Sequence, residues 1–341
     1  MARLVRAVSV AGVISLVGLL GVSHMLVRQI TKEQPVVPTN TPAAPTETVA
    51  EAKPEPFPLG VDPHAESITE RPEVDTYLGE HIDTRSLATR SNRGWFGRIL
   101  GTLAQSAIYQ NFASPTGRIL VIQSGERKEE VANNFGKILK WDNDEKAAFT
   151  TSITDAEPAI SEGKFVPATY ITGKDASPEE VAKLVTDRFE TDIRSRYTED
   201  IEAVVPLEQT LIIASLLERE AYDFDDMRHI SGVIWNRLFA DMNLQLDASL
   251  QYAKGTKSTT SWWPRVVPAD KYIKSPFNTY AHEGLPPAPI ANPSLDAILA
   301  ALNPRKTDCM YYFHDKKGGF YCSVTYEEHV AKLKQIYGRG K

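Results

Sequence analysis

The feature that most constrains this chain is an uninterrupted apolar run near its N-terminus. Residues 7–27 form a 21-residue stretch whose only titratable side chain is His24. About 20 helical residues are enough to cross a hydrocarbon core of roughly 30 Å. A cleaved signal peptide is the alternative, but its apolar core usually has roughly 7–15 residues, and no small-x-small site or lipobox cysteine follows here. The run predicts an uncleaved, single-pass anchor in the cell (inner) membrane within residues 1–32.

The orientation of this anchor is not fixed by charge, because basic residues flank the run equally on both sides. The very short N-terminal tail makes a cytoplasmic N-terminus the simpler choice. We therefore expect the rest of the chain to lie outside the cytoplasm.

Residues 33–115 are predicted to be a Pro-rich linker followed by an ambiguous helical segment. The stretch up to residue 63 is rich in Pro, Thr, Ala and Glu, so it offers little apolar surface to offset the entropy of ordering the chain. Within residues 64–115, apolar side chains recur at helical spacing, which predicts a short amphipathic helix that packs on the domain or lies on the membrane surface. They are Trp95, Phe96, Ile99, Leu100 and Leu103.

Composition excludes several classes of protein. The formal charge of -6 argues against nucleic-acid binding, which usually needs a basic excess. The chain has two cysteines, too few for a disulfide scaffold or a cysteine-rich zinc site. We expect no nucleic-acid partner, no metal and no cofactor.

Residues 116–200 are predicted to form a small α+β subdomain. The stretch RILVIQSG (118–125) predicts a strand that ends at a glycine turn, and residues 125–139 predict an amphipathic helix. A strand, a turn and a helix at this spacing resemble a LysM-like module, which binds N-acetylated glycans; a generic α+β unit is the alternative. Further helices are expected at about 178–197 and 206–221, with strands around 309–325.

Two glutamates near the end of the predicted helix 206–222 are candidates for acid–base chemistry. Glu220 and Glu218 lie among apolar side chains and about 160° apart around the helix, so one cleft can use only one of them. Desolvation raises a carboxyl pKa, as a general acid working near neutral pH requires. Ion pairs with arginines elsewhere are the alternative role. A separate narrow polar stripe on this helix holds Glu208, Ser215 and Arg219.

The string GLPPAPIANP (284–293) is unusual, with four prolines in eight residues. Such a segment cannot continue a helix or a central strand. It predicts a rigid extended loop that is suited to lining one wall of a groove.

Several motifs now occur in one order along residues 118–337: ASLLERE, NRL, LQLD with Tyr252, SPFNTY, GLPPAPIANP, ALNP-x-KTD and YYF-HDKKGG. In this order they closely resemble the endolytic murein transglycosylases of the YceG-like family. The resemblance implies that residues 201–341 form a mixed α/β transglycosylase domain. It also implies peptidoglycan glycan strands as substrate, with membrane-bound cell-wall synthesis machinery as a further partner.

The resemblance implies a mechanism with one glutamate and no metal. That residue protonates the glycosidic oxygen between N-acetylmuramic acid and N-acetylglucosamine, then takes the proton of the muramyl 6-hydroxyl as a 1,6-anhydro ring closes. The family position falls on Glu220, with Glu218 as the fallback. Other family positions expected near the cleft, each with a purely structural alternative, are Gln245, Asp247, Asn278, Tyr280, Pro286 and Asn292.

The sequence departs from the family pattern at three places. Ala221 follows the glutamate where Thr is usual, Ala168 replaces an Asp, and Phe320 stands where a His is common. These departures favour a second hypothesis, a tethered glycan-binding module with a decayed catalytic site. A third hypothesis is a hydrolase in which Asp247 delivers water.

Cys309 and Cys322 flank a predicted hairpin. A turn centred on Lys317-Gly318 would place Cys309 opposite about Tyr326, too far from Cys322 for a disulfide, whereas a turn between Asp315 and Lys316 would bring the cysteines together. We expect the first arrangement and no disulfide, although an oxidising compartment would permit one.

Overall fold

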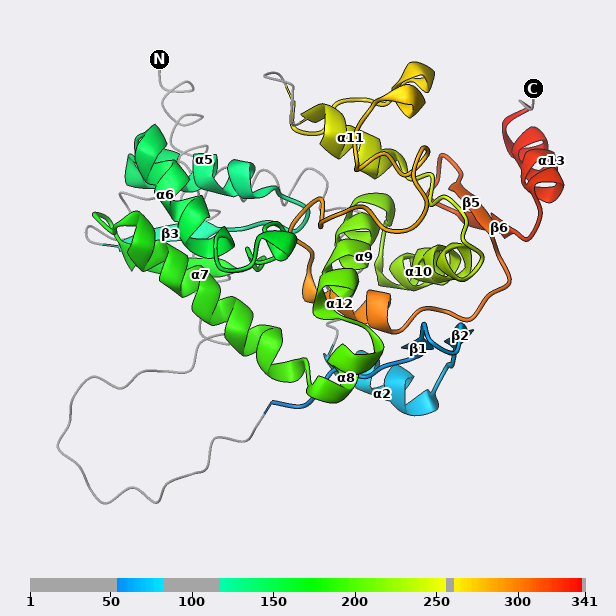
Figure 1. The fold of residues 1–341 in the computed structure, drawn as a ribbon, viewed down its shortest axis with the longest axis horizontal. Helices are drawn as coiled ribbons and strands as arrows, with labels where there is room; N and C mark the ends of the chain where they lie inside the picture. The colour runs from blue at the N-terminus through cyan, green and yellow to red at the C-terminus, as the bar shows by residue number, and fades with distance from the viewer. Residues whose placement is uncertain (1–53, 82–116, 256–260, 339–341) are drawn as a thin grey trace, which may run out of the picture. The chain divides into compact units, whose positions relative to one another are not determined.

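A computed structural model of the chain describes residues 54–81, 117–255 and 261–338, all of them in the unit Pro54–Lys341 (Figure 1). The predicted anchor in residues 1–32 and the predicted helix around Trp95 lie outside the described residues. Within those three ranges, no helix is long and apolar enough to span a membrane. The described part is a mixture of helices and small antiparallel sheets, which confirms the α+β class.

The described elements follow one another in chain order. They are β1 (Val61–Asp62), β2 (Ser67–Ile68), α2 (Pro72–His81), β3 (Gly117–Val121), α5 (Lys128–Leu139), α6 (Asn143–Thr154), η1 (Pro158–Ile160), β4 (Thr169–Gly173), α7 (Pro178–Asp192), η2 (Arg194–Arg196), α8 (Glu199–Val204), α9 (Leu207–Glu220), α10 (Phe224–Phe239), α11 (Asp247–Gly255), η3 (Pro268–Tyr272), α12 (Leu295–Leu302), β5 (Tyr311–His314), β6 (Phe320–Ser323) and α13 (Tyr326–Tyr337).

The packed structure includes residues that the sequence assigned to the linker. Phe57 and Val61 are each 3% exposed and belong to the main hydrophobic cluster. The peptide N–H of Gly60 donates to Leu302 O at 2.9 Å, which ties this segment to the end of α12. A few apolar residues are enough to order this segment, because they pack into a core that other elements also form.

A small hydrophobic cluster is built from β3, β4, α5, α6 and one face of α7. β3 and β4 pair antiparallel, with Leu120 opposite Tyr170, and both side chains are buried. α7 begins with a capping box in which Ser177 Oγ accepts the Glu180 N–H at 3.2 Å while the Glu180 carboxylate accepts the Ser177 N–H at 2.9 Å. The capping box fixes where α7 begins.

The main hydrophobic cluster surrounds α9, which packs against α10, α11 and α12 (Figure 1). Every residue of α9 from Thr210 to Glu218 is buried. A helix that is apolar on all sides belongs in the centre of a domain rather than on its surface. Ser215, predicted on a polar stripe, is also fully buried, because its hydroxyl donates to Ile212 O and accepts the Ile290 N–H.

A polar junction connects the small cluster to the main one. The Asn292 Oδ1 accepts the N–H of Gly163 at 2.7 Å and of Phe165 at 3.1 Å, and its amide donates to Glu126 O at 2.9 Å. Arg127, only 1% exposed, stacks its guanidinium on the ring of Tyr252 at 4.1 Å. These contacts hold the strands and helices of the small cluster against the loops that surround α9.

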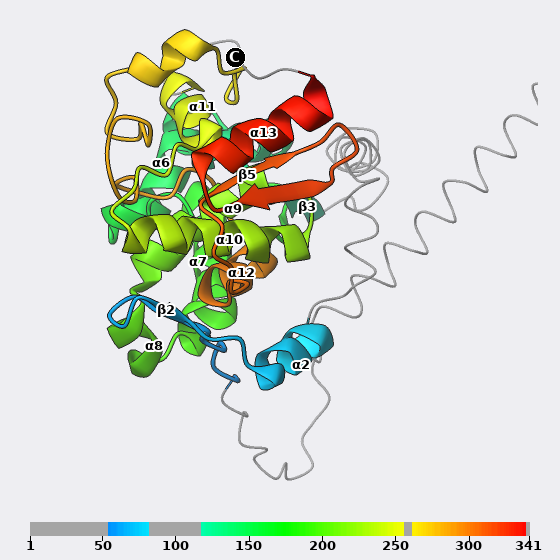
Figure 2. The same ribbon diagram turned by 90° about the vertical axis from the view of Figure 1, so that its right-hand side faces the viewer.

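The C-terminal hairpin pairs β5 with β6 in the register His314 opposite Phe320, and α13 lies along it (Figure 2). Cys309 and Cys322 form a disulfide with a Cα–Cα distance of 5.7 Å. The register is close to the predicted one, with Tyr312 opposite Cys322, but our prediction that no disulfide forms is wrong. Cys309 precedes β5, outside the regular ladder, so the chain bends there and the diagonal pair can meet.

Candidate active site

Glu220 is the last residue of α9 and lies where the helix stops. Ala221 takes an extended conformation, with φ -92° and ψ 153°, and the chain turns there toward α10. The buried helix thus carries Glu220 outward from the core to its edge, where the residue is half-buried. Its side chain stands on a rigid support and remains accessible.

Two donors from distant parts of the chain hold the Glu220 carboxylate. The backbone N–H of Ala248, in the first turn of α11, donates to Oε1 at 3.2 Å. The Tyr312 hydroxyl, from β5, donates to Oε2 at 3.3 Å. The carboxyl group is therefore fixed from both sides.

The environment raises the pKa of Glu220 above its ordinary value of 4.5. Desolvation by burial is the largest cause, and the nearby Asp247 carboxylate adds to it. The bonds from Ala248 and Tyr312 and the charge of His314 act in the opposite direction. A raised pKa favours the protonated form that a general acid needs.

Asp247 and Tyr280 form a polar pair beside Glu220. The Tyr280 hydroxyl donates to Asp247 Oδ1 at 2.7 Å, and burial raises the pKa of that hydroxyl. Gln245 is exposed and adopts φ 49°, while its N–H donates to Thr279 O at 2.9 Å. The structure thus brings three of the predicted site residues together, at the start of α11 and on the loops beside it.

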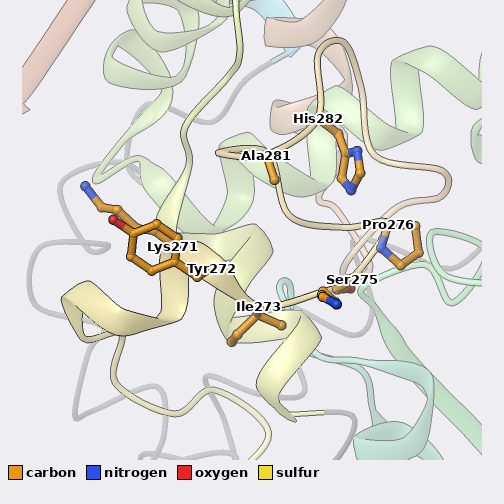
Figure 3. Close-up of a pocket in the computed structure, with 8 residues that line it drawn as sticks. Lys271, Tyr272, Ile273, Ser275, Pro276, Ala281 and His282 are labelled. Carbon is orange, nitrogen blue, oxygen red and sulfur yellow. The ribbon is translucent and has the colours of Figure 1, made fainter.

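A pocket lies next to this pair, between η3 and the loop that follows it (Figure 3). Lys271 and Tyr272 stand on one side, with Pro276 and His282 on the other. The Lys271 ammonium sits 4.6 Å from the centre of the Tyr280 ring, so the pocket adjoins the Asp247–Tyr280 pair.

Glu218 has a different environment from Glu220. It is 9% exposed, and its Oε2 accepts the Ser294 N–H at 3.0 Å and the Ser294 hydroxyl at 2.6 Å. Ser294 is the N-cap residue of α12, and its Oγ in turn accepts the Ala297 N–H. Glu218 therefore helps to fix the start of α12 through Ser294.

Three predicted site residues lie inside the protein. Asn278 is fully buried, its amide donating to the carbonyls of Lys271 and Ile273 while its oxygen accepts the Tyr280 N–H. Asn292 is also fully buried in the polar junction, and Pro286 is buried. The amides fix loops, which is the structural alternative that the sequence allowed. The proline-rich segment forms no helix or strand and packs on α9 through Ile290.

Tyr312 was not among the predicted site residues, although it lies in the motif YYF-HDKKGG. Tyr312 and His314 lie two residues apart on β5, so their side chains share one face of the hairpin. That alternation was visible in the string YYFH. Nothing in the sequence indicated that this face would meet the end of α9.

The three departures from the family pattern lie in ordinary packed positions. Ala221 packs against the main hydrophobic cluster and Ala168 against the small one. Phe320 stacks on Tyr312 with ring centres 5.9 Å apart. Tyr312 and Ala248 supply the two bonds that hold the carboxyl group, so the hydroxyl missing at Ala221 is not needed to orient it.

No three His, Cys, Asp or Glu side chains lie close enough to hold a metal ion in the part of the chain that the structure describes.

Comparison with known proteins adds a family. A model described as the YceG-like family matches residues 88–335. A Bacillus subtilis (strain 168) protein named endolytic murein transglycosylase is 36% identical over 182 residues, 53% of this chain and 49% of that protein. A protein of the same name from Streptococcus pneumoniae serotype 2 (strain D39 / NCTC 7466) is 32% identical over 169 residues, 49% of this chain and 31% of that protein. The chain thus matches about half, or less, of the length of these relatives.

A solved structure is similar as well. A crystal structure described as a yceG-like protein of Listeria monocytogenes superposes with a TM-score of 0.55 at 30% identity. The match covers 63% of this chain and 76% of that one.

Proposed function

The chain belongs to the YceG-like family, and on that premise we propose that it is an endolytic lytic transglycosylase of peptidoglycan. Two relatives that carry the name endolytic murein transglycosylase support the substrate and the reaction class. The observation that carries the proposal is the Glu220 carboxyl group, desolvated and held by Ala248 and Tyr312.

In the proposed reaction, Glu220 protonates the glycosidic oxygen between N-acetylmuramic acid and N-acetylglucosamine, and that bond breaks. The resulting carboxylate then accepts the proton of the muramyl 6-hydroxyl, whose oxygen bonds to the anomeric carbon. The proton is returned and no water is consumed. One carboxyl group suffices because the nucleophile is already part of the substrate, where its effective molarity is high.

Most glycosidases instead use two carboxyl groups, one of which activates water or attacks the sugar. Asp247 is the available second carboxylate. Its bond from Tyr280 supports a role in holding the substrate or orienting neighbouring groups rather than in delivering water. Gln245, exposed on the adjoining loop, is a candidate for binding the acetamido or hydroxyl groups of the sugar.

Further parts of the proposal concern the location of the enzyme and its contact with the glycan. The apolar run 7–27 supports an anchor in the cell membrane, and the disulfide supports an oxidising, extracytoplasmic compartment for the enzyme domain. The pairing of β3 with β4 under α5 and α6 is compatible with a LysM-like, glycan-binding role for residues 116–200. Association with the membrane-bound synthesis machinery rests on the family resemblance alone.

The test is product analysis in ¹⁸O-labelled water. Purified peptidoglycan strands are incubated with the full-length protein, and the new ends are identified by mass spectrometry. The proposal expects anhydro ends, one water lighter than a reducing end and free of ¹⁸O. Reducing ends that carry ¹⁸O would overturn it in favour of a hydrolase, and binding without cleavage would favour a glycan-binding module.

A further inference from the structure

His314 and Asp226 form an ion-pair geometry close to Glu220 that the proposed reaction does not use. The imidazole Nε2 lies 2.9 Å from both carboxylate oxygens of Asp226. His314 is 12% exposed and Asp226 8% exposed at the side chain. A histidine on two carboxylate oxygens in a mostly buried site is held in one orientation.

The pair connects the two elements that position Glu220. Asp226 lies in the first turn of α10 and its Oδ2 also accepts the Tyr222 N–H at 2.8 Å, which fixes the turn directly after Glu220. His314 lies on β5, two residues beyond Tyr312, the donor to Glu220. The contact therefore ties the strand that carries the hydroxyl to the turn that follows the carboxyl group.

Charge is the second link between the pair and Glu220. His314 favours the ionised form of Glu220, in opposition to burial and to the Asp247 carboxylate. The charged or titratable groups around the imidazole come from every neighbouring element: Asp226 from α10, Glu220 from α9, Tyr222 from the turn, Tyr312 from β5 and, through its hydroxyl to His314 O, Tyr337 from α13.

We propose that His314, held by Asp226, is a positioning residue for Glu220: it fixes β5, which carries the Tyr312 hydroxyl, onto the α9–α10 turn and places its imidazole near the Glu220 carboxyl group. This inference deepens the proposed function and rests on the role of Glu220 in it. It assigns no proton transfer to His314.

Two variants separate the hydrogen bond between His314 and Asp226 from the charge of the imidazole. His314→Gln keeps a donor for Asp226 but never carries a charge. His314→Val removes both the donor and the charge. His229→Gln is the matched control, because His229 also contacts Phe320 but bonds Asp225 rather than Asp226.

The first readout does not depend on catalysis. In the full-length protein labelled with ¹³C at the glutamate carboxyl, the Glu220 signal is assigned by its loss in Glu220→Gln and titrated. We expect His314→Gln to move the Glu220 titration to higher pH and His229→Gln to leave it in place. An unchanged Glu220 titration in folded His314→Gln would overturn the inference, whether or not the protein cleaves glycan.

The second readout is the pH dependence of glycan cleavage. Since Glu220 must be protonated to act as the acid, cleavage falls as pH rises through its pKa. His314→Gln is expected to move this fall to higher pH with KM little changed, and His314→Val to lower kcat on the order of 10²-fold through misplacement.

Relocating the imidazole keeps the inference testable if His314→Val folds poorly. Position 320 faces position 314 across the ladder, so side chains at both lie on one face. The double variant His314→Val/Phe320→His should recover part of the lost kcat. Recovery in His314→Val/Phe320→Leu, which restores no imidazole, would contradict the proposal.

Discussion

The two glutamates at the end of α9, Glu218 and Glu220, are separated by one residue but contact different elements. Glu218 faces α12, where the N–H and hydroxyl of Ser294 occupy one carboxylate oxygen. Glu220 faces α11 and β5, where burial and Asp247 raise its pKa while Ala248 and Tyr312 hold it. The two carboxyl groups therefore differ in the groups around them. The donors to Glu218 belong to the start of α12, whereas the surroundings of Glu220 raise its pKa.

The largest expected effect is on cleavage by Glu220→Gln. Removal of the general acid should lower kcat by about 10²–10⁴-fold, while the unfolding midpoint changes little, because the amide oxygen can accept the Ala248 N–H and the amide NH₂ can donate to the Tyr312 hydroxyl oxygen. Glycan turnover and thermal unfolding of the same sample measure both. Turnover close to that of the wild type would contradict the assignment of the general acid to Glu220.

The next effect is on the stability of Glu218→Ala. The loss of both Ser294 bonds should lower the free energy of unfolding by about 1–3 kcal/mol, whereas turnover per folded molecule should stay within a few fold. Urea unfolding and turnover are the measurements. Ser294→Ala is the matched comparison: it keeps the backbone N–H bond to Glu218 but loses the hydroxyl bond to Glu218 and the N-cap bond from Ala297, so a loss of similar size is expected with turnover retained.

A smaller effect is expected for Tyr312→Phe. One donor to Glu220 is lost, and since that bond favours the ionised form, the Glu220 pKa should rise further. Turnover at neutral pH should change on the order of fivefold, and the fall of cleavage at high pH should shift upward. A pH–rate profile identical to that of the wild type would show that Tyr312 does not govern Glu220.

Glu162 is a further glutamate to compare with Glu220. Its pKa is also raised, although it does not lie beside Asp247 or Tyr312. It is fully buried at the polar junction, accepts the Lys128 N–H at 2.9 Å, and burial raises its pKa from 4.5 to about 8. A pKa raised on folding contributes stability below about 4.5 that is lost as pH rises through about 8.

Glu162→Gln should therefore make the free energy of unfolding vary less over that pH range, with cleavage retained. Urea unfolding across the range measures the change. Glu126, whose pKa burial raises to about 7, leaves a residual slope in the same direction. Loss of cleavage in folded Glu162→Gln would mean that the junction takes part in the reaction.

Local patterns predicted the elements that carry the site better than they predicted its contacts. The apolar spacing of residues 206–222 predicts α9 to within two residues at its C-terminus, and the strand 118–125 and helix 125–139 correspond to β3 and α5. α6 was missed because its sequence, NDEKAAFTTSIT, buries only Phe149 and Ile153 and so has little amphipathic pattern.

The site was predicted only in part, because local patterns do not show which distant segments meet. Family positions and the helix pattern led to Glu220, Asp247 and Tyr280, which the structure brings together. The burial of Asn278, the bonds from Ser294 to Glu218 and the bond from Tyr312 to Glu220 depend on how distant segments meet. Periodicity describes one element at a time and carries no such information.

The most direct test of the divided roles is a double-mutant cycle with Glu218→Ala, Glu220→Gln and the double variant, each measured for anhydro-ended product and for free energy of unfolding. We expect Glu220→Gln to remove the product alone, Glu218→Ala to lower stability alone, and the double variant to combine the two losses without interaction. Product that persists in Glu220→Gln, or that disappears in folded Glu218→Ala, would contradict the account.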